Sequence, residues 1–250
     1  MDAPAAGKAV RINRWLPYWA VFQNDIRQTL HSWVYRTWVL VSVLAGGGYL
    51  AYRAGIDHEA GIVQSASTLI SDLLRWTVLG SVTLIIILTV GSIASERGTM
   101  ADSVLSRGIS RYQYFMGKLH ARLFAILLTY FVMGGAALAA SMFLLHEDLS
   151  WRGSLVALAT VAALLATVIT CGVTVSAMVN SSVLGIAVLW VLVYGTGFAL
   201  PPLHRSLNTL PNVLRGYYDL TAQGRLMGCA ALVSAVVAIF GMAWFGRRDV

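Results

Sequence analysis

Long apolar stretches alternate with short polar segments along the chain. A helix that spans a membrane needs about 20 mostly apolar residues. Six stretches approach that length: Trp38–Tyr52, Trp76–Ala94, Leu123–Leu145, Leu155–Met178, Val183–Leu200 and Leu226–Phe245. The first is interrupted by Gly46, Gly47 and Gly48, so it reaches full length only if its helix begins near Trp33. None of the six alternates apolar and polar residues as the strands of a membrane barrel do. The pattern predicts an all-α membrane protein with six transmembrane helices.

Composition and charge support this class and give an orientation. The chain of 250 residues is 58% hydrophobic and 12% charged, whereas soluble domains carry about 25% charged residues. Twelve of the 18 Lys and Arg residues fall on the side of the two termini and six on the other side. The positive-inside rule then places both termini in the cytoplasm. The net charge of +7 follows from this topology and from anionic lipids, so it implies no nucleic-acid partner.

The N-terminal segment, residues 1–32, has a helical pattern of its own. Aromatic and aliphatic residues recur at steps of three and four, and Gln23, Asp25, Arg27 and Gln28 occupy the other faces; the apolar positions are Trp15, Trp19, Phe22, Ile26 and Leu30. Tryptophan favours the membrane interface. We therefore expect an amphipathic elbow helix lying in the cytoplasmic interface, followed by a six-helix transmembrane domain over residues 33–250.

A compact charged segment separates the second and third apolar stretches. Thr99 with Asp102, and Ser110 with Gln113, have the spacing of capping boxes, and Gly108 between them is a typical helix stop. The first piece has an apolar face made of Met100, Val104 and Leu105. Two interpretations fit a structured loop over residues 96–118. It is an interfacial helix that anchors in headgroups, or it is an element that docks onto a partner.

Motifs for catalysis and for metal binding are incomplete in this sequence. Gly117-Lys118 lacks the upstream glycine and the following Ser or Thr of a phosphate-binding loop. His58-Glu59 and His146-Glu147 are not followed by the second histidine of a zinc peptidase. The six apolar cores contain no ionisable residue, and we expect three arginines near their ends to reach the interface, namely Arg36, Arg75 and Arg122. We therefore expect no catalytic residue and no metal, and a proton-coupled carrier is disfavoured.

Small and hydroxylated residues within the apolar stretches predict helix packing. The fourth stretch contains Thr160, Thr167, Thr170, Thr174 and Ser176. We interpret these as partners in interhelical hydrogen bonds and in bonds to the preceding turn rather than as substrate contacts. Gly91 with Ser95, and Gly224 with Gly228, are spaced four residues apart and permit close helix approach.

The charged loop also carries a resemblance to a known family. Glu96-Arg97-Gly98-Thr99, the following segment LSRGISRYQYFMGK, and the ending Phe245-Gly246-Arg247-Arg248-Asp249 resemble sequences of the ABC type-2 permeases. The resemblance implies that the loop 96–118 is a coupling helix that docks into a groove of a separate cytoplasmic ATPase. The coupling residues would be Glu96, Arg97, Gly98, Thr99, Met100, Asp102, Val104, Leu105, Arg107 and Arg111.

The last outer loop, residues 201–225, contains a second segment to which the resemblance gives a role. Pro201-Pro202 ends the fifth stretch, and Pro211 is placed to open a short helix that includes Val213, Leu214, Tyr217 and Tyr218. In the ABC type-2 permeases this region resembles a helical cap over the outer exit. The resemblance thus implies an outer gate at Pro211, Leu214, Tyr217 and Tyr218. A lipid-facing interfacial helix is the alternative.

The resemblance implies a non-catalytic permease subunit of an ATP-driven exporter in a bacterial inner membrane. Its substrate would be lipid-like, drug-like or a peptide, and its partners would be two ABC ATPase subunits that bind ATP and Mg, since this chain would bind no cofactor. Because six helices enclose little volume, we expect a second copy or a similar permease beside it, within membrane lipids. The alternative is a membrane anchor or transmitter that acts on an extracytoplasmic partner without translocation. An intramembrane enzyme is a weaker option, because paired polar groups at depth are missing.

Overall fold

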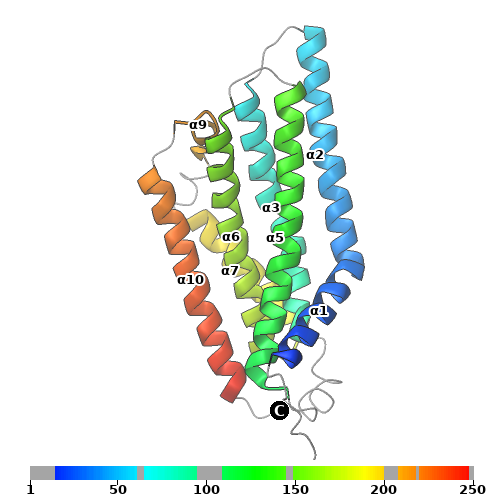
Figure 1. Ribbon diagram of the computed structural model, residues 1–250, viewed down its shortest axis with the longest axis vertical. Coiled ribbons are helices and arrows are strands. Elements are labelled where there is room, and N and C mark those ends of the chain that lie inside the picture. Colours follow the sequence, from blue (N-terminus) through cyan, green and yellow to red (C-terminus); the bar gives the residue numbers. More distant parts are fainter. Residues whose placement is uncertain are drawn as a thin grey trace, which may run out of the picture.

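The computed structural model describes residues 15–60, 65–94, 109–144, 149–199, 208–217 and 220–247. These ranges are helical and contain no strand, which confirms the all-α class (Figure 1). The helices are α1 (Leu16–His31), α2 (Trp33–Ala60), α3 (Ala66–Ala94), α5 (Arg111–Leu144), α6 (Trp151–Met178), α7 (Ser182–Ala199), α9 (Leu210–Leu214) and α10 (Leu220–Arg247). The start of α1 and the end of α10 lie at the same end of the bundle (Figure 1).

Five helices of the described residues are long and apolar enough to cross a membrane, namely α2, α3, α5, α6 and α10. The chain is therefore a membrane protein by the length and composition of its helices. As expected, α2 begins at Trp33, whereas α3 begins at Ala66 instead of near Trp76. The fifth predicted stretch forms α7, which is apolar but shorter than the other five.

The start of α5 is set by a local sequence signal. Ser110 Oγ accepts a hydrogen bond from the Gln113 N–H at 3.2 Å, and Gln113 Oε1 accepts one from the Ser110 N–H at 3.2 Å. This reciprocal pair is the predicted capping box, which satisfies two backbone donors that the first helical turn leaves open. The second predicted capping box, Thr99 with Asp102, lies outside the described residues.

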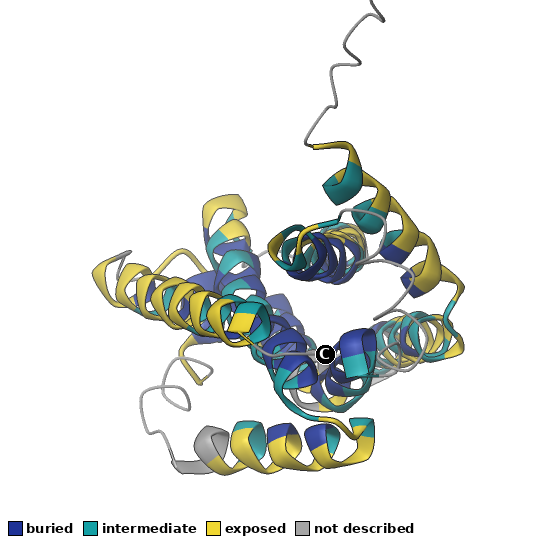
Figure 2. Ribbon diagram, turned by 90° about the horizontal axis from the view of Figure 1, so that it is seen from below, coloured by how far each residue is buried: buried dark blue, intermediate teal, exposed yellow. Residues whose placement is uncertain are grey.

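The centre of the bundle is α6, which packs against α3, α5, α7, α9 and α10. Buried positions lie on the faces turned toward the middle of the bundle, and the outer faces are exposed (Figure 2). Ile169, Val161 and Leu165 of α6 are almost completely buried. At Gly172 an added Cβ would lie 2.0 Å from Thr89 Oγ1. Only glycine therefore permits the close approach of α6 to α3.

A row of threonines joins α6 to α10. Thr160 donates to Gln223 Oε1 at 3.2 Å, Thr167 to the Ala230 carbonyl at 3.2 Å and Thr174 to the Val237 carbonyl at 3.3 Å. Both sets of partners advance by seven residues, so the two helices run parallel in constant register. Thr167 also donates to the Ala163 carbonyl one turn back. These bonds confirm the packing interpretation of the intramembrane hydroxyls.

Candidate functional site

The predicted coupling loop lies almost wholly outside the described residues. This holds for Glu96, Arg97, Gly98, Thr99, Met100, Asp102, Val104, Leu105 and Arg107. Arg111 is described and is the first residue of α5. Its guanidinium lies 3.5 Å from the Gly246 carbonyl at the end of α10. The candidate site is therefore built from the two helix ends that flank the loop, at Ala94 and Arg111.

The helix α1 packs closely on the first turns of α5. A Cβ added to Gly117 would lie 2.9 Å from Val21 Cγ1, so glycine at this position allows the two helices to approach. The Tyr18 hydroxyl lies 2.8 Å from His120 Nδ1. Burial raises the pKa of Tyr18, so this hydroxyl stays protonated at neutral pH and can donate to the ring nitrogen. The contact fixes α1 across the start of α5.

Three buried charges lie within this contact, and we call them the Asp25 cluster: Asp25, Lys118 and Arg122. Asp25 is 1% exposed, and both cations are also buried. Lys118 Nζ lies 3.2 Å from Asp25 Oδ1, and Arg122 Nε lies 3.0 Å from Asp25 Oδ2. Arg122 Nη2 also donates to Asp25 Oδ1 at 3.3 Å. Only the Nη2 contact has the geometry of a hydrogen bond; Nε and Oδ2 form an ion pair, and neither of these two buried atoms has a hydrogen-bond partner among the described residues.

The cluster extends to the end of α3. Lys118 Nζ donates to the Ser92 carbonyl at 2.7 Å and lies 5.3 Å from the centre of the Tyr114 ring. In the same turn of α3, Ser176 Oγ of α6 accepts hydrogen bonds from the N–H groups of Ile93 and Ala94, each at 2.9 Å. Four helices, α1, α3, α5 and α6, are therefore joined by buried polar contacts beside both ends of the loop.

These positions correct two expectations. Arg122 does not reach the interface, because its side chain turns inward to Asp25. Asp25 is not on a solvated face of α1, because that face packs on α5 together with Thr29. The signal in the sequence was present, since Lys118 and Arg122 are four residues apart and so share one helix face. Nothing in the sequence alone pointed that face toward Asp25.

At the opposite end, α9 is inserted between α3 and α6. Leu210 and Leu214 have no exposed surface, and Val213 is buried as well. The Ser150 N–H donates to the Leu214 carbonyl at 2.8 Å, and Arg215 donates to Ser67 Oγ at 2.9 Å. A short helix opened by Pro211 is confirmed. It packs into the bundle, so a lipid-facing position for this helix is wrong.

The tyrosines of the predicted gate do not belong to α9. The helix ends at Leu214, and Gly216 follows with a φ of 92°, a value that glycine adopts readily. Tyr217 lies beyond that turn and is 79% exposed. Tyr218 lies outside the described residues. Of the four gate residues, the structure therefore brings Pro211 and Leu214 together in the bundle and leaves Tyr217 at the surface.

The described residues contain no group of three or more His, Cys, Asp or Glu side chains that could hold a metal ion. The charged groups of the Asp25 cluster contact one another and the Ser92 carbonyl, so the cluster suits a mechanical role, that of holding helices together. Comparison with known proteins adds no further assignment. No family model matches the chain, and no curated protein matches its sequence.

Proposed function

We propose that this chain is the permease subunit of an ATP-driven transporter of a bacterial inner membrane, coupled to a separate ATPase through the loop 96–118. The substrate class is lipid-like, drug-like or peptide, and export is the direction. The observation that carries the proposal is the Asp25 cluster with the hydrogen bond from Lys118 to the Ser92 carbonyl. It joins the surface helix α1 to the two helices from which the loop leaves and re-enters the bundle.

This arrangement suits the transmission of force. A movement of the loop displaces the end of α3 and the start of α5 directly, because both are continuous with it. Lys118 ties these two ends to each other and to α1. Breaking a buried ion pair is strongly destabilising, so we expect the two ends to move as one body. Such rigid-body displacement is a common way to convert partner closure into a change at a distant site.

Six membrane crossings are part of the proposal. The contacts of Gly185 with Val90, and of Tyr194 with Thr83, show α7 running antiparallel to α3 from its end to its middle. Arg215, just after α9, then contacts Ser65 and Ser67 at the start of α3. The chain thus lies at the far end again by Arg215, and in this proposal the sixth crossing falls between α6 and α10 and begins with α7. With that crossing both termini lie in the cytoplasm.

A second permease completes the translocation path in this proposal. The outer faces of α2 and α10 carry many exposed apolar side chains, among them Leu40, Leu44, Leu232, Val236 and Ile239. Such faces suit lipid or another apolar helix. Two bundles, two ATPase subunits carrying ATP and Mg, and surrounding lipid form the complex, and α9 serves as its outer gate.

The second candidate is a transmitter that acts on an extracytoplasmic partner without translocation. The observation that favours it is the complete burial of Leu210 and Leu214, which fill the outer end of the bundle between α3 and α6. A movement at the Asp25 cluster would then reach α9 through these two helices. The movement of α9 would then act on the outer partner rather than on a substrate.

Co-purification from the native host tests the proposal. The tagged chain is isolated in mild detergent, and bound proteins are identified by mass for the wild type, Glu96→Lys, Arg97→Glu and the control Lys8→Glu, which changes charge outside the loop. We expect an ATPase with the wild type and the control, and its loss with both loop variants. Absence of any ATPase after cross-linking, or its retention by both loop variants, contradicts the proposal. An additional extracytoplasmic protein supports the transmitter.

A further inference from the structure

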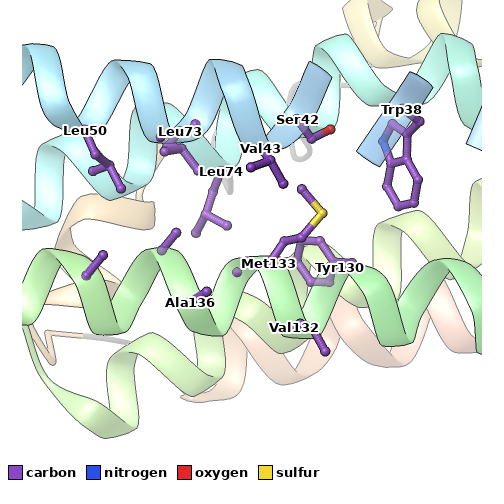
Figure 3. Close-up of a pocket in the computed structure, with 15 residues that line it drawn as sticks. Trp38, Ser42, Val43, Leu50, Leu73, Leu74, Tyr130, Val132, Met133 and Ala136 are labelled. Carbon is purple, nitrogen blue, oxygen red and sulfur yellow. The ribbon is translucent and has the colours of Figure 1, made fainter. Parts of the chain in front are cut away.

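Two cavities flank α2. One of about 380 Å³ lies between α2 and α5, and one of about 500 Å³ lies between α2 and α3. Trp38, Ser42, Gly46 and Leu73 line both, so the two form one hollow divided by α2, which we call the α2 crevice. Side chains of α2 and α5 point toward one another across its first part (Figure 3).

The lining of the α2 crevice is mostly apolar, with hydroxyl groups at Ser42, Tyr49 and Ser81. It includes Leu50, Leu74 and Met133, together with small residues of α5 such as Ala136 and Ala137. The outer face of α2 beside it is also apolar and exposed, as at Leu40 and Leu44. The volumes fall in the range of about 300–1,000 Å³ that ligand sites occupy. The surroundings of such a crevice in a membrane helix are acyl chains, not water.

The glycines of α2 leave this space open. Glycine within a helix costs about 1 kcal/mol relative to alanine, and close approach of another helix is the usual compensation. A Cβ added to Gly47 would meet nothing within 4 Å, and one added to Gly46 would lie 3.8 Å from Leu73 Cδ1. Protein packing therefore does not account for either residue. Both line the crevice, where any larger side chain would fill it.

One polar group in the crevice has no partner. Trp38 is 2% exposed, and its indole N–H finds no acceptor among the described residues. Leaving a buried donor unsatisfied costs about 1–3 kcal/mol. The neighbouring Tyr35 hydroxyl, by contrast, is paired with Thr129 Oγ1 of α5. The crevice thus presents a mainly apolar trough with an indole N–H, unpaired within the described ranges, at one end and the Ser42 hydroxyl beside it.

We propose that the α2 crevice binds one glycerolipid of the membrane, with an ester carbonyl accepting the Trp38 N–H and an acyl chain along Leu73 and Met133. Trp38 is five residues from the start of α2, which places it about 7.5 Å along the helix. That is the depth at which ester groups lie beneath headgroups. The acyl chain then extends toward the middle of the bilayer, past Gly46 and Gly47. This site does not depend on coupling to an ATPase.

Photo-crosslinking of the purified chain tests this site. The chain is placed in nanodiscs that contain a phosphatidylcholine with a diazirine in the middle of an acyl chain, and the labelled residues are mapped by peptide mass. In the wild type we expect labels to concentrate on Leu73, Leu74 and Met133. Gly47→Leu fills the crevice, and we expect this labelling to fall about tenfold, which corresponds to about 1.4 kcal/mol of binding.

Gly48→Leu is the matched control. Gly48 neighbours Gly47 in the same exposed stretch and has equally open surroundings, but it does not line either cavity. We expect its labelling to equal that of the wild type. Equal losses in both variants, or wild-type labels as frequent on Leu40 and Leu44 as in the crevice, overturn the proposal. Ala136→Phe fills the crevice from α5 and decides the matter if Gly47→Leu fails to fold.

Trp38→Phe tests the donor separately. The ring is kept and the N–H is lost, so we expect the wild type to capture an ester-linked probe about tenfold better than an ether-linked one and Trp38→Phe to capture both alike. An unchanged ester preference removes the hydrogen bond from the proposal. Efficient cross-links between two copies of the chain through crevice residues, with little lipid captured, would show that a second copy occupies the crevice and overturn the lipid site.

Discussion

Buried charge is the most informative feature at the scale of single residues. Taking a carboxylate and two cations out of water costs several kcal/mol for each ion, and only excellent mutual geometry offsets that cost. Asp25 contacts both Lys118 and Arg122 within 3.3 Å, but its Oδ2 and the Arg122 Nε have no hydrogen-bond partner in the described part of the chain, so the offset rests on the remaining contacts. Each member of the cluster therefore depends on the others. The carboxylate is the critical member, because both cations contact it.

Asp25→Asn should destabilise the chain by about 3–5 kcal/mol, because it removes the carboxylate that both buried cations contact. The measurement is the midpoint of thermal unfolding in detergent, followed by the fraction of folded monomer. Asp72→Asn is the matched control. Asp72 is only partly buried in α3, and no ion pair between it and another described residue is seen. The control should therefore shift the midpoint little.

A triple variant separates charge from shape. Asp25→Leu with Lys118→Met and Arg122→Met removes all three charges at similar volume, and such replacements are often neutral or stabilising. We expect it to recover most of the stability that Asp25→Asn loses. A triple variant as unstable as the single one would mean that packing of α1 on α5, and not charge compensation, accounts for the loss.

The sequence predicted contacts between residues that are near in the chain, but it did not predict contacts between residues that are far apart. The capping box of Ser110 and Gln113 was predictable because its partners are three residues apart. The ionic partners of Asp25 were not, because they lie 93 and 97 residues away. An amphipathic pattern identifies the apolar face of a helix, but it does not reveal that one carboxylate on the polar face turns into the protein.

At the scale of helices, glycine spacing gave an incomplete guide to packing. The pair Gly224 and Gly228, and also Gly91, have nothing within 4 Å of an added Cβ among the described residues. Close approaches occur instead at isolated glycines such as Gly153 and Gly172 of α6. Spacing reports which residues share a face, whereas a contact also needs a partner helix on that face. Only the tertiary arrangement supplies the partner.

Gly153→Ala should loosen the outer end of the bundle. An added Cβ would lie 2.0 Å from the Val213 carbonyl, which is backbone and cannot rotate away, so α9 must shift. We expect a loss of about 1–3 kcal/mol, typical of overpacking, and faster cleavage of the chain near α9 by an added protease. Both effects follow from the displacement of Leu210 and Leu214.

Gly135→Ala is the control for this helix contact, and its effect should have the opposite sign. Gly135 lies within α5 and has nothing within 4 Å of an added Cβ. Alanine there gains about 0.5–1 kcal/mol of helix stability without a clash. If Gly153→Ala were as well tolerated as Gly135→Ala, then α9 would not be held tightly in the bundle, and its proposed role as a gate would lose its structural basis.

At the scale of the whole molecule, hydropathy predicted the class and most helix positions. Five of the six apolar stretches became helices of membrane-spanning length. The fifth stretch is the exception, because α7 is shorter and its contacts with α3 run from Val90 only to Thr83, near the middle of that helix. Hydropathy counts apolar residues in a row, but it does not report where along the bundle such a helix begins. A crossing made of a short helix such as α7 followed by a buried one such as α9 does not show as one long apolar stretch.

The number of crossings fixes the side of the C-terminus, and labelling can therefore count them. The two native cysteines, Cys171 and Cys229, are first replaced by alanine. Single cysteines are then introduced as Arg27→Cys in α1, Tyr217→Cys after α9 and Arg247→Cys at the end of α10. With six crossings, a membrane-impermeant maleimide should label position 217 in intact cells, and positions 27 and 247 only after permeabilisation.

Five crossings give a different pattern. If α7 entered and left on the same side, positions 27 and 217 would lie on one face of the membrane and position 247 on the other. The labels at 217 and 247 would then exchange relative to the six-crossing result, while the label at 27 would not change. Position 27 thus serves as the internal reference. Only the six-crossing pattern places the end of α10 on the same side as α1 and the loop 96–118, where a single cytoplasmic ATPase could contact all three.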